Sequence, residues 1–267
     1  MSAILGENWM SPISSDATKS TYDLPWLRFA TLCEIVNATF KTSIKKVQQP
    51  TADVYDPTLL VTYSSLTNTP VEDTVKQLQQ TSSIKTMQNA IGAFHQRVLG
   101  SVDGWTDSGP QGGGFDIMSE GKVPAAGNRK VLMEVKMRWN TIKASDEHYT
   151  HQRLAEAVKH FGGHSEAVAY LAQIIPAKNR AYDEPWVVTG RTALEHVRSA
   201  DGKTTYHLVT GQPTALEDLL KVLPHAFNHV LGKQNLPHLD FSNSVDVAIL
   251  NERLTLALPT SSALPVE

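Results

Sequence analysis

Two short stretches decide the fold that this sequence predicts: Gly112-Gly113-Gly114-Phe115-Asp116-Ile117 and Val131-Leu132-Met133-Glu134-Val135-Lys136. Apolar and polar side chains alternate over residues 115–117 and 133–136, as expected of strands whose successive side chains point to opposite faces. Glu134 and Lys136 therefore share one face of the second strand. If the two stretches form a hairpin, Phe115 and Ile117 point into the core. Asp116 then points to the other side, beside that pair of charges.

An acidic residue beside a Glu-x-Lys pair is a set that can hold a divalent metal ion. Mg²⁺ is usually bound by one or two carboxylates together with phosphate oxygens, so Asp116 and Glu134 suffice as side-chain ligands. The backbone carbonyl of Val135 is a natural further ligand. A bound metal lowers the pKa of a water and stabilises charge at phosphorus, and Lys136 would orient that water. Taken singly, a Glu-x-Lys pair is often a solvated strand face, and an Asp after glycines is often a turn residue.

Together, these residues resemble the PD-(D/E)XK nuclease superfamily. Asp116 stands in the Asp position and Glu134-Val135-Lys136 forms the E-x-K half, while Phe115 replaces the proline without removing a ligand. The longer stretch from His95-Gln96-Arg97 to Asn140-Thr141 is similar to type II restriction endonucleases, and more narrowly to the group that cuts GGNCC sites. This closer resemblance covers residues 90 to 145.

The resemblance implies a type II restriction endonuclease that uses Mg²⁺ to cut both strands of double-stranded DNA at a short palindromic sequence. The products would have 5′-phosphate and 3′-hydroxyl ends. It also implies that Gln96 is an extra polar residue near the metal, although an exposed helix residue would look the same in the sequence. A palindromic target needs two equivalent active sites, so a twofold homodimer is expected. Two alternatives stay open: another nuclease of this superfamily, acting in repair or on branched DNA, and a non-catalytic α/β binding module.

Polar residues that could contact DNA lie in two regions beyond the catalytic strand. The candidates for contacts with the DNA backbone, which position a duplex without reading it, are Arg138, Asn140, Thr141 and Lys143. The candidates for base reading are Arg180, Asp183, Glu184 and Arg191, which lie in a proline-bounded loop region. For the first group, a solvated strand end explains the residues equally well. For the second group, ordinary surface loop charges are the favoured interpretation of each residue taken alone.

Composition indicates a globular protein with a substantial core, because 41% of the 267 residues are hydrophobic and 19% are charged. No apolar run is long enough for a transmembrane helix, and the N-terminus lacks the pattern of a secretory signal, so a cytoplasmic location is expected. The single cysteine, Cys33, excludes an intrachain disulfide and is expected to be a buried thiol. The formal charge of −3 argues against bulk coating of nucleic acid. Locally, residues 129–159 contain seven Lys/Arg against four Asp/Glu.

The expected fold class is α/β, a mixed central β-sheet flanked by helices, with an N-terminal helical region. Residues 1–90 are expected to form that helical region packed on the core, residues 91–258 the nuclease core, and residues 259–267 a flexible tail. The pattern predicts helices over 24–47, from 69, over 84–99, over 152–161, over 192–198 and from 214 to just before Pro224. It predicts a meander of strands over 101–139, a buried strand over 167–175 and a strand over 206–209.

Several other residues could take part in chemistry. His95 could act beside Gln96 or pack against Trp105, and Asp103 and Asp107 compete with Asp116 for the role of the first ligand. Asp116 is favoured because apolar residues flank it on both sides. The four residues His148, His151, His160 and His164 do not share one helix face and are not expected to bind zinc.

Overall fold

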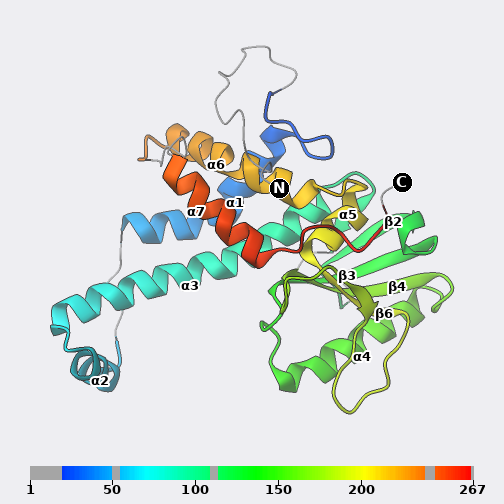
Figure 1. Ribbon diagram of the computed structural model, residues 1–267, viewed down its shortest axis with the longest axis horizontal. Helices are drawn as coiled ribbons and strands as arrows, with labels where there is room; N and C mark the ends of the chain where they lie inside the picture. The colour runs from blue at the N-terminus through cyan, green and yellow to red at the C-terminus, as the bar shows by residue number, and fades with distance from the viewer. Residues whose placement is uncertain (1–19, 50–54, 109–113, 238–243, 266–267) are drawn as a thin grey trace.

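A computed structural model describes residues 20–49, 55–108, 114–237 and 244–265 (Figure 1). The helices are α1 (Phe29–Gln48), α2 (Pro57–Thr67), α3 (Val71–Gly100), a 3-10 turn η1 (Pro124–Ala126), α4 (Ala144–His160), α5 (Gly202–Thr210), α6 (Ala215–Lys233) and α7 (Ser244–Ala257). The strands are β1 (Trp105–Asp107), β2 (Ile117–Val123), β3 (Arg129–Arg138), β4 (Ala167–Ile175), β5 (Asp183–Pro185) and β6 (Val197–Asp201).

The strands form one six-stranded sheet in the order β1-β2-β3-β4-β6-β5. The first three strands are antiparallel neighbours, which confirms the predicted meander. The connections from β3 to β4 and from β4 to β6 cross over, and these strands pair in parallel, while β5 is an antiparallel edge strand. The sheet is thus mixed and lies between helices, as the fold class predicted.

Two apolar layers enclose the sheet. On one face, a large core cluster joins β2, β3 and β4 to α1, α3, α5 and α6; on the other, a smaller cluster joins the same strands to α4 (Figure 1). Strand β4 is buried on both faces, which explains its unbroken apolar sequence and the accuracy of its predicted bounds. In β3, Val131 and Met133 belong to the larger cluster and Leu132 to the smaller, so the alternation predicted for this strand is confirmed.

The N-terminal helices differ in detail from their predicted form. Helix α1 begins five residues later than predicted, at Phe29. Ala30 and Ala38 are exposed, and its buried face is formed by Phe29, Leu32, Cys33, Val36, Phe40 and Ser43. Helix α3 is one continuous helix of 30 residues, not two. Pro70 occupies its N-cap position, and Thr69 makes no capping bond to it. Burial raises the pKa of the Cys33 thiol to about 11, so this side chain is an apolar core group as expected.

Three predictions for the second half of the sheet region are wrong. The helix expected over 192–198 is a loop that leads into strand β6. The strand expected over 206–209 lies within helix α5, every residue of which from Gly202 to Val209 is buried. Helix α6 does not stop before Pro224 but continues to Lys233 with the proline inside it.

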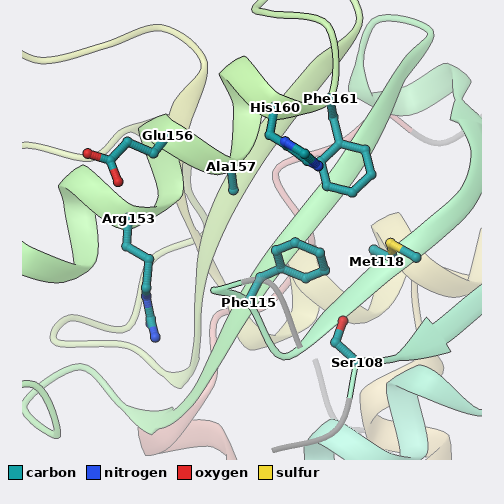
Figure 2. A pocket seen from close by; sticks show the side chains of 8 residues that line it. All are labelled: Ser108, Phe115, Met118, Arg153, Glu156, Ala157, His160 and Phe161. Atoms are coloured by element: carbon teal, nitrogen blue, oxygen red, sulfur yellow. The ribbon is translucent and has the colours of Figure 1, made fainter. Parts of the chain in front are cut away.

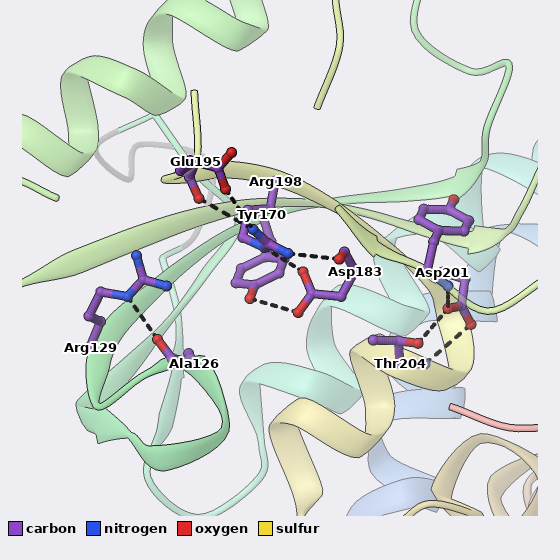
Figure 3. Close-up of polar contacts among 9 residues, drawn as sticks. Ala126, Arg129, Tyr170, Asp183, Glu195, Arg198, Asp201 and Thr204 are labelled. Atoms are coloured by element: carbon purple, nitrogen blue, oxygen red, sulfur yellow. Dashed lines mark hydrogen bonds and ion pairs between the residues drawn. The ribbon is translucent and has the colours of Figure 1, made fainter. Parts of the chain in front are cut away.

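Two polar groups fix the connection around β5 and β6 (Figure 3). Arg198 Nε donates to the Asp183 carboxylate over 2.5 Å, and Arg198 Nη2 donates to the Asp183 carbonyl over 2.7 Å. Asp201, which is fully buried, caps α5 by accepting the backbone N–H groups of Lys203 and Thr204 over 2.9 and 3.2 Å. These bonds satisfy the polar groups that a buried strand-to-helix junction would otherwise leave unpaired.

The outer half of α3 and the short helix α2 extend away from the sheet (Figure 1). None of the described residues of α2 is buried, and Leu66 is 83% exposed. Because α3 runs without a break across position 90, the helical region and the core share this helix. None of the described helices has the length and apolar character needed to cross a membrane.

The segment after α7 differs from the expected flexible tail. Leu258 is buried, the Thr260 carbonyl accepts a bond from Lys203 Nζ over 3.1 Å, and the N–H of Ala263 donates to Thr204 Oγ1 over 2.9 Å. Residues 258–265 therefore run along helix α5.

Candidate active site

Asp116 lies just before β2 begins, and its backbone and side chain both contact β3. Ile117 pairs with Met133, the N–H of Asp116 donates to the Met133 carbonyl over 2.8 Å, and the charge of Glu134 acts on the Asp116 carboxylate. Asp116 itself lies in a bend just before β2 and not on the strand. This bend corrects one expectation: Phe115 and Ile117 pack into opposite apolar clusters and not into the same core.

The Asp116 carboxylate is held against β3 by a backbone bond. The N–H of Val135 donates to Asp116 Oδ2 over 2.7 Å. Burial and then the negative charge of Glu134 raise the pKa of Asp116 to about 6, against the lowering effects of the Val135 bond and of the cations Lys136 and Arg153. The site therefore favours a proton or another positive species at this carboxylate.

The Glu134 carboxylate is buried between two cations. Its side chain is only 7% exposed, and Oε1 lies 2.6 Å from Lys136 Nζ. Oε2 lies 2.7 Å from Arg153 Nη2. The predicted placement of Glu134 and Lys136 on one face of β3 is thus confirmed. Both oxygens of this buried carboxylate are thus in contact with a cation.

Arg153 is the member of this cluster that sequence reasoning missed. It comes from α4, the helix that covers the smaller apolar cluster, and Leu154 beside it belongs to that cluster. Its only trace in the sequence is its place in the mildly basic stretch 129–159. Nothing in the spacing shows that α4 lies over β3, so the contact with Glu134 follows from the fold alone.

Gln96, which was expected near the metal, lies on helix α3 and contacts β1, the strand next to β2. Its Nε2 donates to Asp107 Oδ1 over 2.9 Å, and Asp107 is paired with Ile117 across β1 and β2. His95 points elsewhere: Nδ1 lies 2.8 Å from the hydroxyl of Tyr206, and complete burial lowers the pKa of His95 to about 4. His95 is therefore a neutral core residue.

The residues expected to contact DNA lie on the surface. Arg138, Asn140, Thr141 and Lys143 are exposed at the end of β3 and in the turn before α4. Arg180 is paired with Glu184 through two bonds of 2.6 and 3.1 Å, and both side chains are about half exposed.

Arg191 lies against α4, where it donates to His148 Nδ1 over 3.0 Å and to Gln152 Oε1 over 3.3 Å. Asp183 is bound by Arg198, and its side chain is 16% exposed. Of the three glycines that precede Phe115, Gly114 is described, and residues 109–113 lie outside the described ranges.

A cavity of about 530 Å³ adjoins the charged cluster (Figure 2). Its lining is Ser108, Phe115, Met118, Arg153, Glu156, Ala157, His160 and Phe161. Phe115 precedes Asp116 and Arg153 contacts Glu134, so the cavity and the carboxylates share one side of the sheet.

The donor set fits a hard divalent cation. Asp116 and Glu134 supply carboxylate oxygens, and the bond from Val135 N–H shows that this residue's polar groups face the same edge of β3. Among the described residues, no group of three His, Cys, Asp or Glu side chains lies close enough together to bind a metal ion. Two carboxylates with a backbone carbonyl and waters are nevertheless the usual protein share of a Mg²⁺ site that also binds phosphate.

Comparison with known proteins agrees with this geometry. The family described as Eco47II restriction endonuclease matches residues 25–232, which include every element from α1 to the end of the sheet. The chain belongs to the Eco47II restriction endonuclease family. The resemblance to type II restriction endonucleases is thereby confirmed.

Two relatives of this Eco47II-family protein are restriction enzymes. It is 35% identical over 158 residues to the type II restriction enzyme Eco47II of Escherichia coli, which covers 56% of this chain and 62% of that enzyme. It is 25% identical over 153 residues to the type II restriction enzyme Sau96I of Staphylococcus aureus, covering 54% of each. The matched regions therefore span less than two thirds of these relatives. No solved structure matches the Eco47II-family chain described above.

Proposed function

We propose that this protein is a Mg²⁺-dependent type II restriction endonuclease that cuts both strands of DNA at a short palindromic sequence, GGNCC. The main support is that Asp116 feels the charge of Glu134, which lies beside Lys136, in a member of the Eco47II family. Two neighbouring carboxylates, the buried one of Glu134 and the half-buried one of Asp116 with its pKa raised to about 6, form a site that a cation would stabilise.

In this proposal, the carboxylates of Asp116 and Glu134 and the carbonyl of Val135 hold the metal. When bound, the metal supplies an activated water and stabilises negative charge on the phosphate. Lys136, whose ammonium lies beside Glu134, orients that water for in-line attack. The reaction would leave 5′-phosphate and 3′-hydroxyl ends. Gln96, on helix α3, supports the site through its bond to Asp107 on β1.

The partner in this proposal is double-stranded DNA in the cytoplasm, bound by a homodimer. A twofold dimer presents two identical sites to the two strands of a palindrome. Arg138, Asn140, Thr141 and Lys143 are exposed and would contact phosphates near the cut. Arg180 and Arg191 would have to leave Glu184 and His148 in order to reach DNA.

The experiment is digestion of phage DNA by the purified protein with Mg²⁺, with EDTA in place of Mg²⁺, and with the Lys136→Ala variant. Lys122→Ala is a matched control, because Lys122 lies on β2 and pairs with Glu166, away from the carboxylates. Discrete Mg²⁺-dependent fragments that are lost with Lys136→Ala and kept with Lys122→Ala are the expected result. Sequencing the fragment ends then gives the target and the stagger.

Other outcomes select the alternatives. Random fragments would indicate a nuclease of the same superfamily without a fixed target sequence. Intact DNA across many substrates would indicate a non-catalytic binding module.

A further inference from the structure

The cluster contains a second cation that the proposed mechanism does not use. Arg153 Nη2 lies 2.7 Å from Glu134 Oε2, while Lys136 lies on the other oxygen. Both oxygens of the carboxylate are therefore in contact with a positive charge. A metal ion that binds Glu134 must compete with a bound cation for at least one of these oxygens.

The position of Arg153 is built into the fold. A Cβ atom at Gly114 would lie 2.8 Å from Arg153 Cγ, and Gly114 has a φ of +93°, so the glycine makes room for the arginine. The guanidinium also lies over the ring of Tyr149, 5.8 Å from its centroid. Its Nε is buried and has no hydrogen-bond partner among the described residues. The guanidinium is thus directed at Glu134 and not held by a network of its own.

The four charged side chains balance one another. Asp116 and Glu134 contribute two negative charges when ionised, and Lys136 and Arg153 contribute two positive ones. A divalent ion added to this neutral group meets less attraction than it would at two unpaired carboxylates. Removing one cation would leave a net negative site.

We propose that Arg153 is a positioning residue that occupies Glu134 as a resident cation and thereby weakens the binding of the metal by the protein alone. Arg153 acts through Glu134 and needs no contact with the reacting phosphate. The proposal rests on the proposed function, because it takes Glu134 to be a metal ligand. A structural clamp would act in the opposite direction, since its loss would disorder Glu134 and weaken metal binding.

The test is titration of the metal-free protein with Mn²⁺ in the absence of DNA, followed by electron paramagnetic resonance of the free ion. Mn²⁺ uses the same oxygen ligands as Mg²⁺. Arg153→Met should bind Mn²⁺ about tenfold more tightly than the wild type, the effect of one charge-assisted contact. Arg153→Gln, which keeps a polar group but no charge, should also bind more tightly. Lys159→Met removes a charge from the same helix without touching Glu134 and should change nothing.

A further variant, Glu134→Gln, separates the proposed role of Arg153 from the proposed metal site. Mn²⁺ binding that is lost in Glu134→Gln and tightened in both Arg153 variants supports the inference. Unchanged or weaker binding in the Arg153 variants, with binding still dependent on Glu134, overturns the role of Arg153 and leaves the metal site intact. No Glu134-dependent binding in the wild type or in either Arg153 variant overturns the metal site and with it the proposed function. Circular dichroism confirms that each variant is folded.

Discussion

The backbone N–H of Val135 donates to the carboxylate of Asp116 over 2.7 Å, and so one bond joins a residue outside β2 to the middle of β3. This bond stabilises the ionised carboxylate, yet the pKa of Asp116 is raised to about 6. Burial and the charge of Glu134 therefore outweigh the bond. The metal-free protein keeps Asp116 ionised at neutral pH at a cost in stability.

This cost predicts a pH dependence. The folded pKa of Asp116 lies above its ordinary value of 3.8, so the folded state binds more protons than the unfolded state between pH 3.8 and about 6. The contribution of Asp116 to the free energy of unfolding therefore falls as the pH rises through that window. In EDTA at neutral pH, the free energy of unfolding of Asp116→Asn should be about 1–3 kcal/mol higher than that of the wild type. Near pH 4, the two proteins should have the same free energy of unfolding.

Denaturant unfolding at several pH values measures this difference. Asp103→Asn is the matched control, because its acidic group shares no contact with Glu134 and should give a difference that does not follow this window. An Asp116→Asn advantage that is constant with pH would contradict the predicted pKa.

The contact between Gln96 and Asp107 predicts how the extra polar residue acts. Gln96→Ala and Asp107→Ala each remove the 2.9 Å bond, so each should lower the free energy of unfolding by about 1 kcal/mol. If Gln96 also acts at the site, Gln96→Ala should lower the cleavage rate about tenfold more than Asp107→Ala. The measurements are denaturant unfolding and single-turnover cleavage of both variants. Equal cleavage rates would show that Gln96 only stabilises the fold through Asp107.

Two glycines should respond to alanine in opposite ways. A Cβ at Gly202 would clash with the Ile174 carbonyl oxygen, a backbone atom of β4, so Gly202→Ala should cost more than about 2 kcal/mol of stability. A Cβ at Gly92, inside α3, meets nothing within 4 Å, and Gly92→Ala should stabilise by about 0.5–1 kcal/mol. Thermal unfolding of the pair tests this, and a similar shift for both would refute the close packing of α5 on β4.

The segment after α7 should contribute to stability. Replacing residues 259–267 by a Gly/Ser stretch of equal length removes the bonds from Lys203 to the Thr260 carbonyl and from Ala263 to Thr204. We expect a loss of about 1–3 kcal/mol in the free energy of unfolding. Ser262→Ala alone, which removes a 3.0 Å contact with His207, should cost less. A neutral replacement would show that the segment is the flexible tail the sequence suggested.

The sequence was most informative where one element lies beside its neighbour in the chain. Glu134 and Lys136 share a face because they are two apart on a strand, and Asp116 joins them across a short hairpin. Strand β4 was recognised because its apolar run ends at a proline. These features depend on local geometry alone.

The sequence was least informative where distant elements decide the environment. Helix α5 is buried all round, its polar side chains included, so it has no exposed polar face of the kind that marks a surface helix. Arg153 reaches Glu134 only because α4 covers that face of the sheet. The bend before β2, which turns Phe115 away from Ile117, is likewise set by packing on two different clusters.

From the short connection of β2 and β3 we also expect an order in which the charged cluster is assembled during folding. Its strands are joined by the short turn over 124–128, whereas β4 and β6 pair Ala169 with Val197 across a longer loop. Loop-closure entropy therefore favours early formation of the hairpin. Asp116 and Glu134 then meet while water still screens their repulsion, and the arrival of α4 buries Glu134 together with the positive charge of Arg153.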